Sequence, residues 1–432
     1  MESKKEIQTV SFINERIFNH VKAFSFPRLA GTEGERKAVE LAVNTFKDID
    51  FKESQIEKEP FEFSDFYATT LIKLIGLINL TFSFTLILFA YIYPFITVIT
   101  IGFMTIFIIL LMRGLRHPEF PGFWGKYYGE TLSATNVFVK LPARQLPEKF
   151  AGNIVISAHL DSKSQSFKTR WRVYTYGFWL YSGIILGGFF IVFLIDIFTV
   201  INVDVRILSF GIWTTTILIS FSNIVLMLLN TNNKSPGALD DASGMAIVFE
   251  LSSYFKDHPL NNFNLWFCQF SAEELGTMGS RIFVSNRENK FVRGLVFQIN
   301  SDMVSSATFG KNKNKVQYLK SYGVFPRRTI APLLNEYLHE AARIENLHID
   351  GFHVSTGCHT DTVPFHLRKD FCAVDITTRA AAKWTHNKED TPDKVDPQVL
   401  RDACVIIKRT VLLLDKDYNI LCESQKSTQM EK

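Results

Sequence analysis

Hydrophobic positions along the chain form two kinds of segment, long uncharged runs and short apolar runs bounded by polar residues. The longest uncharged run extends from Leu74 to Met112, 39 residues without Asp, Glu, Lys or Arg. As a single helix it would measure about 58 Å, roughly twice the thickness of the hydrocarbon layer of a bilayer. The run therefore predicts two helices of about 20 residues each, joined by a turn at Pro94.

A second pair of uncharged runs covers Val173–Ile195 and Ile207–Asn233, separated by a short connector with Asp196, Asp204 and Arg206. The alternative is a set of helices buried in a large soluble core. Such helices seldom stay purely apolar for the ~20 residues that a bilayer requires. We therefore expect a multi-pass integral membrane protein, with four transmembrane helices in two hairpins at residues 70–113 and 173–233.

The charges beside these runs indicate which side of the membrane the rest of the chain occupies. Two hairpins return all long polar segments to one side, which carries almost every neighbouring cation: Lys73, Arg113, Arg116, Arg170, Arg172 and Lys234. The opposite turns carry only Arg206. The positive-inside rule places the polar segments in the cytoplasm, with an organellar or external side as the alternative. The start of the chain has no apolar stretch typical of a cleavable signal peptide.

The remaining segments, residues 1–69, 114–172 and 234–432, show alternating strand and helix patterns. Short apolar runs suited to buried strands are Asn153–Ala158, Asn264–Phe270 and Gly294–Ile299. Helical spacing follows in Ala242–Phe255, and again in Leu400–Leu414 behind an Asp396-Pro397 start signal. This alternation predicts a three-layer α/β domain with a mixed, largely parallel central sheet, whose strand ends would hold any active site.

Composition narrows the functional classes. Hydrophobic residues make up 47% of the 432 residues, which excludes wholesale disorder. The net charge of +4, from 47 basic and 43 acidic residues, does not indicate a nucleic-acid partner. The five cysteines form no CxxC pair, which is typical of reduced thiols. Because the predicted spans hold no ionisable residue, a transporter or channel is disfavoured as well.

Metal-capable side chains follow the predicted strands and short polar loops. They are His159 and Asp161, the pair Asp240-Asp241, the pair Glu273-Glu274, Asp302, and His386. Each cluster alone is ordinary, because adjacent acids often form an exposed first helical turn. Together, two histidines and several carboxylates at strand ends are a normal ligand set for two zinc ions, which a carboxylate can bridge. Such a pair of ions can activate water for hydrolysis.

These motifs resemble the co-catalytic zinc aminopeptidase family, which includes bacterial secreted aminopeptidases, glutamate carboxypeptidase, glutaminyl cyclases and a metallopeptidase of the endoplasmic reticulum. The similarity extends from Arg28–Arg36 to His386–Thr391 and covers most of the chain outside the apolar runs. It implies a zinc exopeptidase-like fold interrupted by two transmembrane hairpins. It also implies a dizinc exopeptidase acting on peptides, with an aminopeptidase preferred over a carboxypeptidase because that activity is the family's commonest.

The resemblance also implies a ligand set. His159 and Asp302 would bind one zinc ion, Glu274 and His386 would bind the other, and Asp240 would bridge them. Other divalent metals can occupy sites of this kind.

Two further acids receive roles by the same resemblance. Glu273 would be the general base that takes a proton from the metal-activated water and passes it to the leaving amine. Asp161 would lie behind His159 and fix the tautomer of its imidazole. Asp390 would brace the loop of the closing motif, while Asp241 and Ser243 would cap the following helix.

The spacing of the ligands connects the apolar runs to the site. His159 and Asp240 are 81 residues apart, and removing the 70 residues of Gln165–Lys234 leaves 11. The second hairpin is therefore interpreted as an insertion into an active-site loop, with the metals close to the bilayer surface. The first hairpin similarly precedes Ser133–Val137, which resembles the family's strand before the first histidine.

One segment departs from the family pattern. Many members carry an Asp-His pair where this chain has Asp361 followed by Thr362, and His359 lies nearby but out of register. We therefore interpret His359 as a loop histidine and not as a ligand.

A single-zinc glutaminyl cyclase-like acyltransferase is an alternative function, because the motif does not fix the number of metals. A non-catalytic receptor or scaffold is disfavoured, because every ligand position and the base are present. Side-chain specificity and oligomeric state stay open.

Overall fold

The structure is a computed structural model of the 432-residue chain, and it describes residues 12–114, 117–122, 125–167, 169–199, 204–305, 315–355 and 360–423. The chain folds into two compact units. The first, here the α/β unit, comprises Met1–Glu62, Leu132–Ser164 and Asn233–Lys432. The second, here the helical unit, comprises Phe63–Thr131 and Gln165–Asn232.

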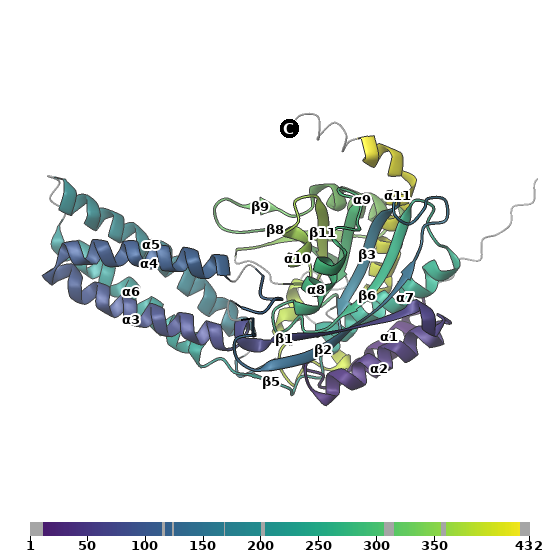
Figure 1. The fold of residues 1–432 in the computed structure, drawn as a ribbon, viewed down its shortest axis with the longest axis horizontal. Coiled ribbons are helices and arrows are strands. Elements are labelled where there is room, and N and C mark those ends of the chain that lie inside the picture. The colour runs from purple at the N-terminus through teal and green to yellow at the C-terminus, as the bar shows by residue number, and fades with distance from the viewer. Residues whose placement is uncertain are drawn as a thin grey trace, which may run out of the picture. The chain divides into compact units, whose positions relative to one another are not determined.

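The helical unit consists mainly of four long helices: α3 (Thr70–Ile92), α4 (Pro94–Gly114), α5 (Thr169–Phe198) and α6 (Val205–Met227). They lie side by side in Figure 1. The predicted corner is confirmed, since α3 ends just before Tyr93 and Pro94 begins α4, where its missing N–H leaves no helical hydrogen bond unmade. The short elements η2 (Asp65–Tyr67), β4 (Ser164–Gln165) and β5 (Thr231–Asn232) accompany these helices along the chain.

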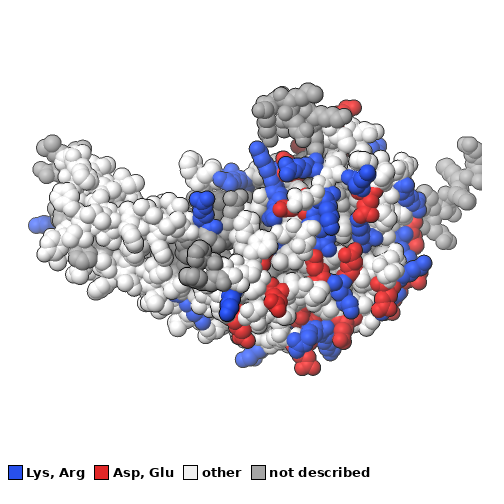
Figure 2. Space-filling model, in the orientation of Figure 1, with Lys and Arg blue, Asp and Glu red and all other residues white. Residues whose placement is uncertain are grey.

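Large apolar side chains face outward from these helices. Phe84 is 72% exposed, Ile99 71% and Phe210 75%, and Figure 2 shows few charges on the face of this unit that it draws. Three helices among the described residues are long and apolar enough to cross a membrane, at Asp65–Thr85, Trp171–Phe198 and Arg206–Met227. A shorter apolar helical stretch, Phe95–Phe107, lies within α4. Membrane association is thus indicated, while four spans in two hairpins stay a prediction.

The α/β unit is built on a mixed sheet. In spatial order its strands are β1 (Ile56–Ser64), β2 (Thr131–Leu141), β6 (Phe263–Phe270), β3 (Gly152–His159), β7 (Val296–Ser301), β11 (Phe371–Ile376), β8 (Val316–Tyr322) and β10 (Ile349–Val354), and β9 (Arg328–Thr329) pairs with β8. Strands β6, β3, β7 and β11 run parallel at its centre. Strand β2 is antiparallel to β6, and β8 is antiparallel to β11. The predicted mixed, largely parallel sheet is confirmed.

Helices cover both faces of this sheet, so the three-layer prediction holds as well. The helices are α1 (Asn14–Phe24), α2 (Glu33–Asp48), α7 (Ser243–Asp257), α8 (Met278–Arg287), α9 (Pro332–Ile344), α10 (Val363–His366) and α11 (Pro397–Lys416), with short turns η1 (Glu53–Gln55), η3 (Ala238–Ala242), η4 (Arg379–Lys383) and η5 (Pro392–Lys394). Alternate residues of β3 reach opposite cores, because side chains along a strand point to opposite faces. Ile154 and Ile156 pack with α1, α2, α7, α9 and α11, whereas Val155 packs with α8 and α10.

The elements predicted from the sequence fall close to their observed bounds. Asn153–Ala158 lies within β3, and Asn264–Phe270 lies within β6. Strand β7 begins two residues after the predicted Gly294, because Gly294 has a φ of +76° and belongs to the preceding turn. Helix α11 begins at Pro397 behind Asp396, whose side chain accepts a hydrogen bond from the Gln398 amide at 3.0 Å.

Four of the five cysteines lie in the described part of the chain, and all four are free thiols: Cys268, Cys372, Cys404 and Cys422. Cys358 and His359 lie outside the described residues.

Candidate metal centre

The candidate ligands meet where the central strands end. His159 is the last residue of β3, Asp302 follows β7, and the Glu273-Glu274 pair lies in the loop after β6. These three strands are parallel neighbours, so their carboxyl ends lie at one edge of the sheet. The sequence placed these residues correctly because the strand ends could be read from the apolar pattern.

Asp240 and His386 reach the same edge from loops. Asp240 lies in η3, directly before α7. The Asp390 carboxylate holds this turn by accepting hydrogen bonds from the amides of Leu239 at 2.7 Å and Asp240 at 3.2 Å. Asp390 was expected to brace the loop of its own closing motif, and these two hydrogen bonds brace the Asp240 turn instead. His386 lies four residues before it, with a φ of +59°.

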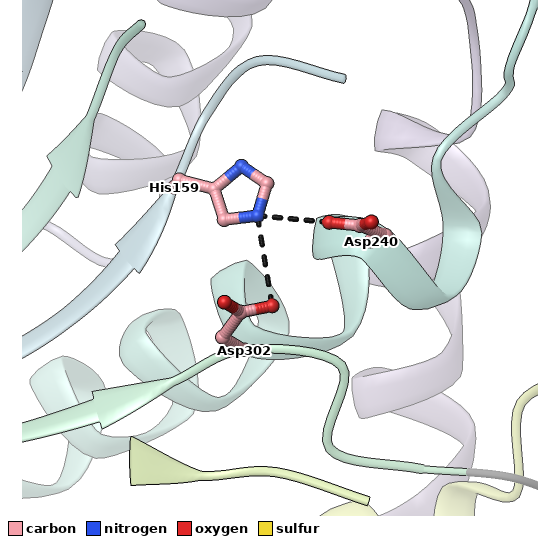
Figure 3. Close-up of side chains that lie close together, drawn as sticks. All are labelled: His159, Asp240 and Asp302. Carbon is pink, nitrogen blue, oxygen red and sulfur yellow. Dashed lines mark ion pairs between the residues drawn. The ribbon is translucent and has the colours of Figure 1, made fainter. Parts of the chain in front are cut away.

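The ligand atoms form two groups that share Asp240. In the first, His159 Nε2 lies 3.0 Å from Asp240 Oδ1 and 3.7 Å from Asp302 Oδ1 (Figure 3). In the second, His386 Nε2 lies 3.1 Å from Asp240 Oδ2 and 3.2 Å from Glu274 Oε2. Within each group all ligand atoms lie within 4.8 Å of one another. The two oxygens of Asp240 therefore face different imidazoles.

These residues fit a pair of divalent cations. All five are buried, with exposures from 1% for His159 to 8% for His386. Buried carboxylates are costly unless cations compensate them. The buried Asp302 Oδ1 has no hydrogen-bond partner within the described part of the chain, as expected of an atom placed for a metal. Imidazole nitrogens with carboxylate oxygens suit zinc, and other divalent ions can use the same donors.

The electrostatics of the cluster favour the anionic forms of Asp240 and Glu274, whereas burial raises the pKa of Asp302. Burial acts to raise the pKa of Asp240, but the imidazoles of His386 and His159 outweigh it and hold that pKa well below its usual range. Burial likewise opposes ionisation of Glu274, yet His386 and Lys163 lower its pKa to about 2. Burial acts to lower the pKa of His159, but the neighbouring carboxylates of Asp161, Asp240 and Asp302 raise it well above its usual value. Metal binding must therefore displace a proton from His159.

Lys163 is a neighbour of the site that the sequence analysis missed. Its Nζ lies 2.7 Å from Glu274 Oε2 and donates to the Glu274 carbonyl oxygen at 3.0 Å. The only signal in the sequence was its place four residues after His159, in the loop that follows β3. The contact fixes the position of the Glu274 carboxylate.

Glu273 and Asp161 lie directly beside the two groups. Glu273 is 7% exposed. Burial raises its pKa well above the usual value; the charge of His159 lowers it, while that of Glu274 raises it further. Asp161 contacts His159 Nδ1 through its own carbonyl oxygen at 3.0 Å, and its carboxylate Oδ1 lies 3.6 Å from the same nitrogen. The carbonyl oxygen of Asp161 is thus closer to the imidazole than its carboxylate is, although the carboxylate was expected to make this contact.

The helix-capping role expected of Asp241 and Ser243 needs correction. Asp241 does accept a hydrogen bond from the Gly244 amide at 2.9 Å, but it also accepts one from the His159 amide at 3.1 Å and one from the Met303 amide at 3.2 Å. Ser243 donates to the Leu239 carbonyl at 2.7 Å and caps nothing. Asp241 therefore ties together the backbones of three loops that carry ligands.

Arg28 is a second residue whose role the sequence did not show. Its side chain is fully buried and donates to the carbonyl oxygens of Leu160 at 2.7 Å, Pro236 at 2.7 Å and Gly237 at 2.9 Å. Burial lowers its pKa, and the charge of Asp241 acts against that shift. Arg28 thereby joins the loop after His159 to the loop before Asp240.

The segment that departs from the family pattern forms a separate hydrogen-bonded cluster. The Thr362 and Thr360 hydroxyls donate to Asp375 Oδ2 at 3.0 and 2.7 Å. Asp361 is buried and accepts a hydrogen bond from the Ser280 hydroxyl at 2.5 Å. Thr362 thus contacts Asp375 and not the two ligand groups, while the position of His359 lies outside the described residues.

Comparison with known proteins agrees with this geometry. The sequence model of Peptidase family M28 matches residues 224–411 of the chain. This match covers 188 of the 432 residues, less than half of the chain. Within the matched range lie four of the five candidate ligands and Glu273, whereas His159 precedes it.

Relatives of known name are also similar to the chain. Over 183 residues the chain is 26% identical to aminopeptidase YwaD of Bacillus subtilis (strain 168), a match that spans 41% of this chain and only 37% of the relative's length. The zinc aminopeptidase BSAP from Bacillus subtilis superposes with a TM-score of 0.52 at 12% identity, covering 93% of this chain and 94% of that one. The aminopeptidase from Aneurinibacillus sp. strain AM-1 gives 0.51 at 14% identity, covering 92% and 93%. At these identities the structures establish a shared fold.

Proposed function

We propose that this protein is a member of Peptidase family M28 and a membrane-anchored dizinc metallopeptidase that removes residues from the N-termini of peptides. The observation that carries the proposal is the position of Asp240, whose two oxygens lie 3.0 Å from His159 Nε2 and 3.1 Å from His386 Nε2. A carboxylate placed between two ligand groups suits a pair of ions about 3.5 to 4 Å apart. The names of the related aminopeptidases support peptide N-termini as the substrate.

In this proposal each ion has its own group. His159 and Asp302 would hold one zinc ion, Glu274 and His386 would hold the other, and Asp240 would contribute a ligand to each. Bound ions would supply Lewis-acid chemistry, by lowering the pKa of a water molecule and polarising the scissile carbonyl.

The remaining steps belong to Glu273. Its carboxylate takes a proton from the attacking water and passes it to the nitrogen of the leaving amine. Burial raises the pKa of Glu273 well above its usual value, the direction that favours a group that both accepts and donates a proton. Asp161 holds the Glu273 amide at 3.0 Å and so positions the base.

The helical unit anchors the enzyme in the bilayer in this proposal, through four spans in two hairpins. The outward apolar side chains of α3 to α6 support lipid contact. The cations next to the apolar runs support a catalytic side that faces the cytoplasm.

The decisive experiment is product analysis by mass spectrometry. Detergent-purified protein, with zinc or with a chelator, is given peptides whose N- or C-termini are free or blocked. We expect chelator-sensitive loss of single residues from free N-termini only. The Asp240→Asn variant should be inactive, whereas Glu336→Gln, which changes an exposed acid of α9, should match the unmodified protein.

Other outcomes of this experiment would change the assignment. Trimming from free C-termini would reverse the orientation of the substrate. Absence of cleavage with metal bound would refute the peptidase; loss of ammonia from peptides that begin with Gln would then identify a cyclase.

A further inference from the structure

The β8–β9 hairpin carries the most exposed large apolar side chain of the described residues. Ser321 pairs with Thr329 and Tyr322 pairs with Arg328, so residues 323–327 form the hairpin tip. Phe325 in this tip is 94% exposed, compared with 75% for Phe210 in the helical unit. Its neighbour Val324 is 43% exposed. An aromatic ring held almost entirely in water by a short paired ladder has no packing role within the α/β unit.

Cations without acidic partners flank this ring in the sequence. Residues 320–328 contain Lys320, Arg327 and Arg328 and no Asp or Glu, and all three cations are exposed. Arg327 is held near the tip by its Nε, which donates to Ser321 Oγ at 3.1 Å. None of the three forms an ion pair with a residue that the structure describes. By contrast, Arg343 on the neighbouring helix α9 lies 2.6 Å from Glu340.

The tip is too small for a stable protein interface. Two apolar side chains at the end of a narrow hairpin bury far less than the roughly 800 Å² per partner that specific protein complexes require. An aromatic ring flanked by cations instead suits the interface of an anionic bilayer, where the ring enters the boundary of headgroups and acyl chains. Each basic residue near such a surface strengthens binding about five-fold.

We propose that the hairpin tip is a second membrane contact, in which Phe325 inserts into the interface of an anionic bilayer while Arg327 and Arg328 bind headgroup phosphates. The inference rests on the membrane anchor of the proposed function, because a single ring with two cations gives only weak binding by itself. Spans in the same chain supply a high effective concentration of bilayer for the tip. The hairpin carries none of the ligand or base residues, so this contact is distinct from the catalytic chemistry.

The test uses the full chain reconstituted in vesicles of equimolar phosphatidylcholine and phosphatidylglycerol. The photoreactive residue p-benzoylphenylalanine replaces Phe325, and lipid adducts are quantified by mass spectrometry after irradiation. Phe150 is the matched control, because it is also a phenylalanine of the α/β unit and is 58% exposed. We expect at least five-fold more lipid adducts at position 325 than at position 150.

The charge requirement is tested in the same vesicles. Arg327→Gln with Arg328→Gln should lower the adduct yield at position 325 several-fold, whereas Arg343→Gln, which removes a cation already paired with Glu340, should leave it unchanged. The yield should also fall in pure phosphatidylcholine and at high salt. An equal yield in both lipid compositions would overturn the role of the arginines.

A probe in the helical unit separates failure of the hairpin from failure of the anchor. Phe221 of α6 is 66% exposed and should form lipid adducts if α6 spans the bilayer. Adducts at position 221 without an excess at position 325 would overturn the hairpin contact alone. Absence of adducts at both positions would overturn the anchor as well. Adducts of position 325 with a second copy of the chain or with an added peptide would replace the bilayer as the partner.

Discussion

The Asp161 carboxylate accepts a hydrogen bond from the backbone amide of Glu273 at 3.0 Å through Oδ1, and one from the Glu274 amide at 3.3 Å through Oδ2. The carbonyl oxygen of the same residue contacts His159 Nδ1 at 3.0 Å. Asp161 therefore joins a ligand of the first group, a ligand of the second group and the proposed base. One residue behind the site, through its carboxylate and its carbonyl oxygen, thus sets the relative position of all three.

Substitution of Asp161 by Asn tests this role. The amide has only one acceptor oxygen, so one of the two backbone N–H groups loses its partner, and its NH₂ group faces an amide donor. We expect zinc affinity to fall about 10- to 100-fold, as for other groups that orient metal ligands. Competition with a chromophoric chelator measures the change, and Asp370→Asn, at an exposed position, is the control. Unchanged affinity would show that the contact to the loop is dispensable.

Glu273→Gln separates catalysis from metal binding. The glutamine cannot carry the proton, so turnover should fall about 100- to 10,000-fold, the usual contribution of a general base. Zinc content per chain should stay unchanged, because the ligand contacts are made by Glu274 and not by its neighbour. In the matched variant Glu274→Gln, both turnover and zinc content should fall. Substantial activity in Glu273→Gln would remove this residue from the mechanism.

Asp240 should be the one ligand whose loss affects both metal groups. Asp240→Asn replaces a carboxylate whose oxygens face His159 and His386, so binding at both groups should weaken. Asp302→Asn should weaken only the group of His159. Elemental analysis after dialysis is then expected to give close to no zinc for the first variant and about one ion per chain for the second. Two ions retained in Asp240→Asn would disprove the bridge.

The sequence was informative about the site wherever a ligand follows a strand. The positions of His159 and Asp302 at strand ends could be predicted, because the apolar runs NIVISA and GLVFQI have clear boundaries in the sequence. The supporting contacts could not be placed, because they run from side chains to the backbone of distant loops and leave no periodic signal. Arg28 donates to the carbonyl of Gly237, 209 residues away, and Asp241 accepts from the amide of His159, 82 residues away. Such contacts depend on loop positions that the apolar pattern does not record.

The buried carboxyl group of Glu35 leads to a prediction about how folding stability depends on pH. It is 1% exposed on α2, and its Oε1 accepts hydrogen bonds from the Thr135 amide at 3.0 Å and the Ser271 hydroxyl at 2.9 Å. Burial raises its pKa from 4.5 to about 7. The folded state therefore holds a proton that the unfolded chain releases between these values, so stability falls as pH rises through this window. The loss contributed by Glu35 is at most about 3 kcal/mol.

Glu35→Gln should remove this part of the pH dependence. The single carbonyl oxygen of glutamine can accept both hydrogen bonds, because both go to the same oxygen in the native residue. We expect the drop in melting temperature of the detergent-solubilised protein between about pH 5 and about pH 8 to be smaller in the variant. Glu40→Gln, at an exposed position of the same helix, is the control. Burial also raises the pKa of Asp361 to about 7 and that of Asp375 to about 6, so both groups reduce stability as pH rises through the same range. Part of the drop in melting temperature should therefore remain in Glu35→Gln. Equal drops in the native protein and Glu35→Gln would contradict the prediction.

The orientation of the chain in the membrane is tested with two single cysteines at exposed positions. With both hairpins spanning and the catalytic side in the cytoplasm, Lys126 precedes β2 on the inner side and Asp204 lies in the outer turn between α5 and α6. In intact cells a membrane-impermeant maleimide should label Asp204→Cys and leave Lys126→Cys unlabelled until the cells are lysed. The native protein controls for its own thiols. Labelling of Lys126→Cys alone in intact cells would place the catalytic side outside the cytoplasm. Labelling of both would mean that the second pair of helices does not cross as a hairpin, because a hairpin must put its turn and its ends on opposite sides.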